Sequence, residues 1–248
     1  AGETLPVENP ARRQIIAHVP RSRAEDVDRA VQAAHKAFPA WSRLAPRERG
    51  RMLIEIGDKL TARGEELARL ISLETGNVLK TQARPEGHGA GYVFRTFGGL
   101  VGEIKGETVP LGETMLSYTR REPYGVVGAI IPWNLPVGIG GLKVAPALAA
   151  GNTVVLKAAE DAPLSVLLLA EICQEVLPPG VLNVVTGYGA ECGAPLARHE
   201  LVRKLAFTGS TATGKSIMSA AAERIVPVSL ELGGKSPSIV YPDMNEDW

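Results

Sequence analysis

The chain has 248 residues, of which 45% are hydrophobic and 22% charged, an ordinary globular composition that excludes wholesale disorder and a collagen-like fibre. Its 27 lysines and arginines balance 27 aspartates and glutamates, so it lacks the basic surplus on which nucleic-acid binding depends. Two cysteines are too few for a secreted disulfide framework, and no signal-peptide pattern opens the chain, which favours a cytoplasmic protein.

The first hundred residues are predicted to be helical. Ser22 followed by Glu25 forms a capping-box pattern, and apolar residues at spacings of three and four continue from there to Phe38. A second helix is predicted to begin at Pro46 and to continue to a stop at Gly76. A third is predicted over residues 86–101, although five glycines within that range disfavour it.

The pattern changes at residues 109–121, where the alternation of Leu116, Tyr118 and Arg120 predicts a solvent-facing β-hairpin. From residue 126 onward, apolar runs alternate with helical patterns, which predicts a doubly wound parallel α/β sheet of the Rossmann type. The most apolar stretch, residues 135–150, is too short and too interrupted by proline, glycine and lysine to span a bilayer. The predicted strands are residues 126–131, 153–156, 181–185, 202–207, 227–230 and 238–241, and the predicted helices between them are 137–150, 163–177, 190–198 and 213–224.

Polar or glycine-rich segments follow five of these strands. Ligands bind beyond the carboxyl ends of strands in such sheets, so these segments are candidate site residues. They are Pro132–Trp133–Asn134, the segment from Lys157 to Glu160, the glycines Gly187, Gly189 and Gly193, the segment from Phe207 to Ser216, and the segment from Glu231 to Lys235.

One of these segments has a second interpretation. Residues 209–216, from Gly209 to Ser216, match the pattern G-x-x-x-x-G-K-[ST] between a strand and a helix, as the phosphate-binding loop of an NTPase would. A well-formed Walker B strand is missing, because Asp243 follows residues 239–241 only after Pro242. The loop would also follow a late strand instead of the first, so the pattern disfavours an NTPase without excluding phosphate binding at the helix N-terminus.

Together the motifs resemble the aldehyde dehydrogenase superfamily. The segments IPWNLP, KAAE, GYG, FTGST and ELGGKSP occur in that family's order and spacing, and the helical start and YTRREPYGVVG extend the resemblance over essentially the whole chain. The resemblance implies NAD-dependent, non-acylating oxidation of an aldehyde to a carboxylic acid, through a cysteine thiohemiacetal and thioester. It also implies a homodimer or homotetramer joined through the hairpin, whose exposed edge another strand would cover.

The resemblance assigns roles to particular positions. Asn134 matches the asparagine whose amide stabilises the oxyanion, and Glu231 matches the general base that activates water. On their own, Asn134 could cap the following helix and Glu231 could be a surface carboxylate. Lys157 and Glu160 match residues that bind ribose hydroxyls, and Glu160 favours NAD because a carboxylate repels a 2′-phosphate. The other positions matched to cofactor binding are Ile131, Pro132, Trp133, Gly189, Gly193, Phe207, Thr208, Gly209, Ser210, Thr213, Leu232 and Gly233.

The division of the chain and its missing parts follow from the same resemblance. Residues 1–104 and 124–235 are expected to form an NAD-binding domain, residues 105–123 an oligomerisation hairpin, and residues 236–248 the start of a truncated catalytic domain. The nucleophilic cysteine is expected beyond residue 248, because neither Cys173 nor Cys192 matches it, so this chain alone is expected to be inactive. A catalytically silent dinucleotide-binding module remains the alternative. No metal site is predicted, and the sequence does not identify the aldehyde.

Overall fold

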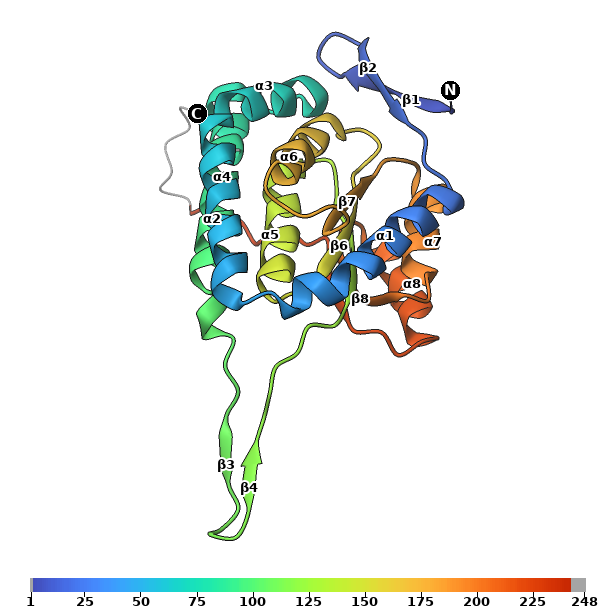
Figure 1. The fold of residues 1–248 in the computed structure, drawn as a ribbon. Helices are drawn as coiled ribbons and strands as arrows, with labels where there is room; N and C mark the ends of the chain where they lie inside the picture. Colours follow the sequence, from blue (N-terminus) through green and yellow to red (C-terminus); the bar gives the residue numbers. More distant parts are fainter. Residues whose placement is uncertain (1, 242–248) are drawn as a thin grey trace.

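The computed structural model describes residues 2–241 and has a five-stranded parallel β-sheet at its centre (Figure 1). The strand order is β7-β6-β5-β8-β9, so the chain starts in the middle of the sheet, builds one half and then crosses back to build the other. The winding reverses between β5 and β8, where open α/β sheets bind ligands. The strands are β5 (Val126–Ile130), β6 (Thr153–Lys157), β7 (Leu182–Val185), β8 (Val202–Thr208) and β9 (Val228–Glu231).

The central strand β5 and its neighbour β6 are buried along their whole length. Every residue of β5 and of β6 is buried, because helices cover both faces of the sheet. Side chains alternate between the faces, so Val127 and Ala129 join one core cluster while Val126 and Ile130 join the other. Parallel strands, crossover helices and two cores confirm the predicted doubly wound α/β fold.

The helices form one layer on each face of the sheet (Figure 1). Helices α2 to α6 fill one core with side chains such as Leu53 and Phe94, and α1, α7 and α8 fill the other with Val31 and Leu196. Between residues 2 and 241, no helix combines the length and apolar character that crossing a bilayer requires. The helices are α1 (Ala24–Arg43), α2 (Pro46–Ala62), α3 (Gly64–Thr75), α4 (Arg84–Gly99), α5 (Pro136–Ala149), α6 (Leu164–Gln174), α7 (Ala194–Arg198) and α8 (Thr211–Ala222), with short helical turns η1 (Leu79–Ala83), η2 (Val101–Glu103) and η3 (Gly189–Gly193).

Three of the glycines in α4, where glycine disfavours a helix, allow this helix to pack closely against α2 and α3. Glycines of α2 and α3 recur every seven residues and face glycines of the antiparallel α4 across a contact with no room for a Cβ atom. A Cβ on the first member of each pair would lie 2.6–2.7 Å from the carbonyl oxygen of the second. The pairs are Gly50 with Gly98, Gly57 with Gly91, and Gly87 with Gly64.

Two β-hairpins lie outside the central sheet. The first pairs β1 (Thr4–Asn9) with β2 (Gln14–Pro20), and its buried side chains pack against α6. The sequence interpretation missed this hairpin. The second pairs β3 (Thr108–Pro110) with β4 (Leu116–Tyr118) and projects from the body of the molecule (Figure 1). The second hairpin was predicted, and Leu116 on it is 82% exposed.

Three local predictions were wrong. Helix α1 begins after Arg23 and not at the Ser22–Glu25 box, because the Ser22 N–H donates to Thr186 O while the Arg23 N–H donates to the Asp26 carboxylate. The predicted second helix is two helices that meet at Arg63, although it stops at Gly76 as expected, in the left-handed conformation. Residues 238–241 form no strand, since they leave the sheet after β9 and pair with nothing in residues 2–241.

Candidate functional site

A cavity of about 410 Å³ opens at the C-terminal ends of β5 and β6, beside the point where the winding reverses. Its floor includes Ile130 and Lys157, the last residues of those strands. Two helical walls present mostly small side chains at spacings of about one turn, which leaves a slot between them, and the larger Arg198 and Ile217 also line it. The small wall residues are Ala190, Ala194 and Ala197 on η3 and α7, and Ala212, Ser216 and Ala220 on α8. The sequence interpretation missed this pattern of small residues.

Lys157 brings a buried cation to this cavity. Its side chain is 4% exposed, and its Nζ lies 2.8 Å from Glu160 Oε2. Among the described residues, Glu160 is the only hydrogen-bond acceptor of that ammonium group, so two of its three N–H donors remain for a ligand. A donor and a carboxylate acceptor side by side suit a pair of vicinal hydroxyl groups, such as those of a ribose.

The N-terminus of α8 lies at the rim of the same cavity. Gly209 and Ser210 alone separate β8 from α8, and a Cβ at Gly209 would lie 2.5 Å from the ring of Phe207. Ser210 caps the helix, because its Oγ accepts the Thr213 N–H at 3.2 Å. The first N–H groups of such a helix have no intrahelical acceptor and can bind an anion.

The NTPase interpretation of residues 209–216 does not fit this geometry. Residues from Thr211 onward are helical, so Lys215 lies within α8 and no loop remains to wrap around a phosphate. Gly214 packs against Leu232, since a Cβ there would lie 2.6 Å from the end of that side chain. The Walker-type pattern therefore describes a capped helix and its packing.

The loop between β5 and α5 carries Asn134. The side chain of Ile131 is buried in the core beside α5, whereas Trp133 is 54% exposed and Asn134 is exposed. Asn134 does not cap α5, because Leu135 is the N-cap residue and the first helical N–H groups bond elsewhere. Within residues 2–241 the side-chain amide of Asn134 makes no hydrogen bond, so it is free to donate to a ligand.

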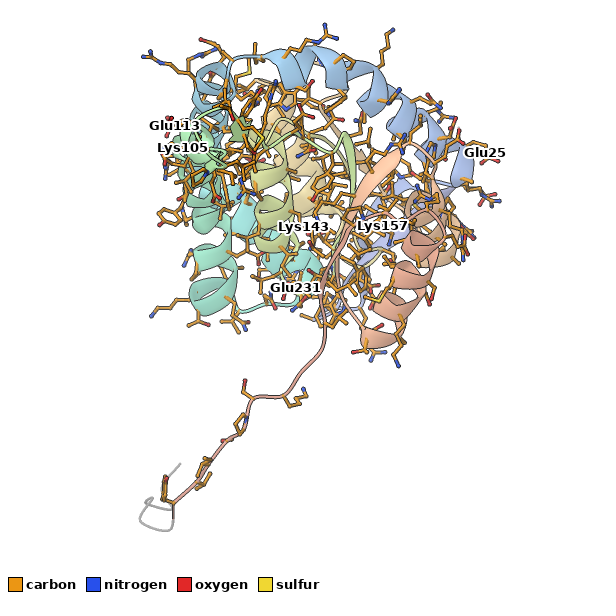
Figure 2. The ribbon with its side chains drawn as sticks, turned by 90° about the horizontal axis from the view of Figure 1, so that it is seen from below. Glu25, Lys105, Glu113, Lys143, Lys157 and Glu231 are labelled. Atoms are coloured by element: carbon orange, nitrogen blue, oxygen red, sulfur yellow. The ribbon has the colours of Figure 1, made fainter. Side chains whose placement is uncertain are left out.

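A second cavity, of about 660 Å³, lies on the opposite face of the sheet between α5, β8 and β9. Glu231, Lys143 and Thr208 line it together with the apolar side chains of Ile139 and Leu142. Figure 2 shows Lys143 on α5 and Glu231 at the end of β9. Burial lowers the pKa of Lys143, and the charge of Glu231 opposes that shift. Glu231 itself is exposed, so the described residues do not provide the desolvation expected around a general base.

Comparison with known proteins identifies the family. The profile of the aldehyde dehydrogenase family matches residues 1–247. The chain belongs to the aldehyde dehydrogenase family. A long-chain-aldehyde dehydrogenase of Acinetobacter is 46% identical over 226 residues, which make up 91% of this chain and 45% of that protein. An acetaldehyde dehydrogenase of Pseudomonas aeruginosa is 44% identical over 236 residues, 95% of this chain and 47% of that protein.

A solved structure extends the comparison to three dimensions. The NAD⁺ complex of an aldehyde dehydrogenase from Bacillus cereus superimposes with a TM-score of 0.94 at 42% identity, covering 97% of this chain and 50% of that one. The chain thus spans about half the length of the aldehyde dehydrogenases that it matches.

In this aldehyde dehydrogenase chain, the predicted cofactor residues do not all face one cavity. Lys157, Gly189, Gly193 and Thr213 line the first cavity, whereas Thr208 lines the second with Glu231. On β5 it is Ile130, not the neighbouring Ile131, whose side chain reaches the first cavity, because alternate side chains point to opposite faces. The remaining predicted positions line neither cavity: Pro132, Trp133, Glu160, Phe207, Gly209, Ser210, Leu232 and Gly233.

Neither cysteine of the chain is placed to act as a nucleophile. Cys173 in α6 and Cys192 in η3 are both fully buried, and neither lines the two cavities. Burial raises the pKa of Cys192 to about 11 and raises that of Cys173 further. Both side chains therefore stay protonated near neutral pH, and a protonated thiol is a poor nucleophile.

Proposed function

We propose that residues 1–248 form the NAD-binding part of an enzyme that oxidises an aldehyde to a carboxylic acid. The observation that carries this proposal is the slot at the ends of β5 and β6, with buried Lys157 at its floor and the capped N-terminus of α8 at its rim. The dinucleotide fits these groups: the slot suits a flat base, Lys157 and Glu160 suit ribose hydroxyls, and the helix N-terminus suits a pyrophosphate. The Bacillus cereus relative that contains NAD⁺ supports the assignment.

The chemical roles proposed for this chain concern charge and proton transfer. A thiolate attacks the aldehyde carbon to form a C–S bond, and the Asn134 amide donates to the oxygen as it becomes negative. Bound NAD supplies the hydride acceptor. Glu231 then accepts a proton from the water that attacks the thioester carbon, which releases the acid and the thiolate. Because Cys173 and Cys192 are buried and protonated, the proposed nucleophile lies outside these residues.

The finer assignments belong to the same proposal. Residues 1–104 and 124–235 would form the NAD-binding domain, and the hairpin of residues 105–123 would join subunits into a dimer or tetramer. The exposed Met115, Leu116 and Tyr118 on this hairpin support that role, since an uncovered apolar edge favours pairing with another chain. The substrate is proposed only as an aldehyde, because the two curated relatives are named for substrates of very different length. A cytoplasmic location remains a prediction.

If the nucleophile lies outside these residues, this chain should bind NAD but should not oxidise an aldehyde. Calorimetric titration of residues 1–248 with NAD should give saturable binding, and Lys157→Met should weaken it about 10-fold or more, because charge-assisted hydrogen bonds are lost. Lys204→Met is the matched control, since Lys204 lines only the second cavity. Adding an aldehyde should produce no absorbance of reduced nucleotide. If the chain does not bind NAD, or if Lys157→Met and Lys204→Met weaken NAD binding equally, the proposed site is wrong. If the chain alone oxidises an aldehyde, the proposal that the nucleophile lies outside these residues is wrong.

Glu160 is predicted to make the site prefer NAD over NADP. Its carboxylate lies 2.8 Å from Lys157 Nζ and would repel a 2′-phosphate on the same ribose. Glu160→Ser should reduce the ratio of NAD affinity to NADP affinity about 10-fold or more. The substitution removes that repulsion, and Lys157 and Arg198 remain at the cavity as cations that would attract the 2′-phosphate. Competitive titration with both nucleotides measures the ratio. Tighter binding of NADP by the unsubstituted chain would show the prediction to be wrong.

A further inference from the structure

Helix α5 begins without a capping side chain of its own. Leu135 is its N-cap residue and Pro136, the first helical residue, has no N–H group. The next two N–H groups, those of Val137 and Gly138, both donate to Oε1 of Glu86 at 2.9 Å. Glu86 lies in the first turn of α4, so a carboxylate 51 residues earlier in the chain holds the start of α5.

The loop that precedes α5 is held from a second direction. The carbonyl oxygen of Asn134 accepts a hydrogen bond from Asn77 Nδ2 at 3.0 Å. Asn77 is fixed in turn, because its N–H donates to Thr75 Oγ1 at 3.0 Å and its carbonyl accepts from Ser72 Oγ at 2.8 Å. The main chain that follows the Asn134 side chain is therefore tied to the helical layer at two points.

Burying the Glu86 carboxylate costs desolvation free energy, and among the described residues only the hydrogen bonds from α5 offset that cost. Glu86 is 8% exposed, and its Oε2 is buried without a hydrogen-bond partner among the described residues. Burial raises the pKa of Glu86, and the two backbone N–H groups of α5 oppose that shift. The positive end of the helix dipole also favours a negative charge at this point. All the hydrogen bonds of this carboxylate are thus directed at the N-terminus of the helix that follows Asn134.

We propose that Glu86, with help from Asn77, is a positioning residue for Asn134. By fixing the first turn of α5 and the carbonyl of Asn134, the two side chains hold in place the main chain from which the Asn134 side chain extends, which restricts where its amide can lie when substrate binds. This inference rests on the proposed function, in which that amide donates to the substrate oxygen. Donors of this kind act because they are oriented beforehand, and a displacement of about 1 Å can cost about 100-fold in rate.

The chain contains a matched control for this proposal. Glu74 likewise caps α6, accepting from the N–H groups of Leu164 at 2.6 Å and Ser165 at 3.0 Å and from the Ser165 hydroxyl, and it is 3% exposed. The N-cap residue of α6, Pro163, likewise provides no side-chain hydrogen bond. Asn134 lies in the loop before α5, whereas the loop before α6 carries Glu160. Both carboxylates therefore support a helix, but only Glu86 supports the helix next to the proposed oxyanion donor.

The test compares Glu86→Ala with Glu74→Ala in the complete protein that carries these residues. Both variants should lower Tm by several degrees, because each leaves a helix uncapped. Only Glu86→Ala should also lower kcat at saturating NAD, about 10- to 100-fold, with the KM for NAD changed less than about threefold. Glu86→Gln should keep most of the kcat, since its amide oxygen accepts the same two N–H groups. The proposal would be overturned if neither alanine variant lowered kcat, or if both lowered it by the same factor.

A double-mutant comparison separates this proposal from the function on which it rests. In an Asn134→Ala background, Glu86→Ala should cause no further loss of kcat, because the group it positions is gone. If Asn134→Ala leaves kcat unchanged, the role of Asn134 is wrong. If Asn134→Ala lowers kcat but Glu86→Ala does not, only the positioning role is wrong. Should Glu86→Ala fail to fold, Asn77→Ala removes the second tie, and a kcat that Asn77→Ala does not lower would likewise overturn the proposal.

Discussion

Asn134→Ala is expected to lower kcat about 10²- to 10³-fold in the complete protein, the typical loss when one oxyanion donor is removed. The KM for NAD should change little, because Asn134 does not line the cavity proposed for the nucleotide. Steady-state kinetics at saturating NAD measure both quantities. The expected pattern is that of a group that interacts with the transition state and hardly with the bound reactants.

Stability provides the control for this variant. The Asn134 side chain is exposed and makes no hydrogen bond within residues 2–241, so its removal should leave Tm within about one or two degrees of the original value. A large fall in Tm would point to an unrecognised structural role. A kcat that falls less than about fivefold would remove Asn134 from the proposed chemistry.

Gly91→Ala is expected to destabilise the fold by about 3 kcal/mol, at the upper end of overpacking costs. Gly91 lies in the glycine contact between α2 and α4, where a Cβ would overlap the carbonyl oxygen of Gly57 and Oγ1 of Thr61. The backbone cannot yield without separating the helices, so the core around Phe94 and Leu53 should loosen too. Equilibrium unfolding in urea gives the free energy of unfolding directly.

Gly89→Ala is the matched control two residues away in the same helix. A Cβ at Gly89 would meet no atom within 4 Å, so alanine should fit without strain. The free energy of unfolding should then rise by about 0.5–1 kcal/mol, because alanine favours a helix more than glycine does. The two substitutions should therefore have opposite signs. A similar destabilisation by both would contradict the close-packing explanation, because a Cβ at Gly89 has no atom to overlap.

The candidate site could be located from the sequence only in part. Lys157, Gly189 and Thr213 could be placed near one ligand because they follow strands of a predicted parallel sheet. The side of the sheet that each residue faces could not be predicted: Ile130 reaches the first cavity and Ile131 does not, because a one-residue error in a strand reverses the face. The sequence could not predict that Asn134 does not cap α5, because the carboxylate that accepts the first N–H groups of this helix comes from Glu86 on α4.

The sequence by itself determined the alternation of strands and helices, the protruding hairpin and the family, because these depend on local periodicity, turn residues and short motifs. Only the tertiary structure decided the features that join distant segments. The glycines of α4 disfavour a helix locally, yet they permit its contact with Gly50 and Gly57. The carboxylates of Glu74 and Glu86 cap helices that begin far along the chain. Hydrogen bonds and close contacts act between neighbours in space, whereas a pattern in the sequence reports neighbours in the chain.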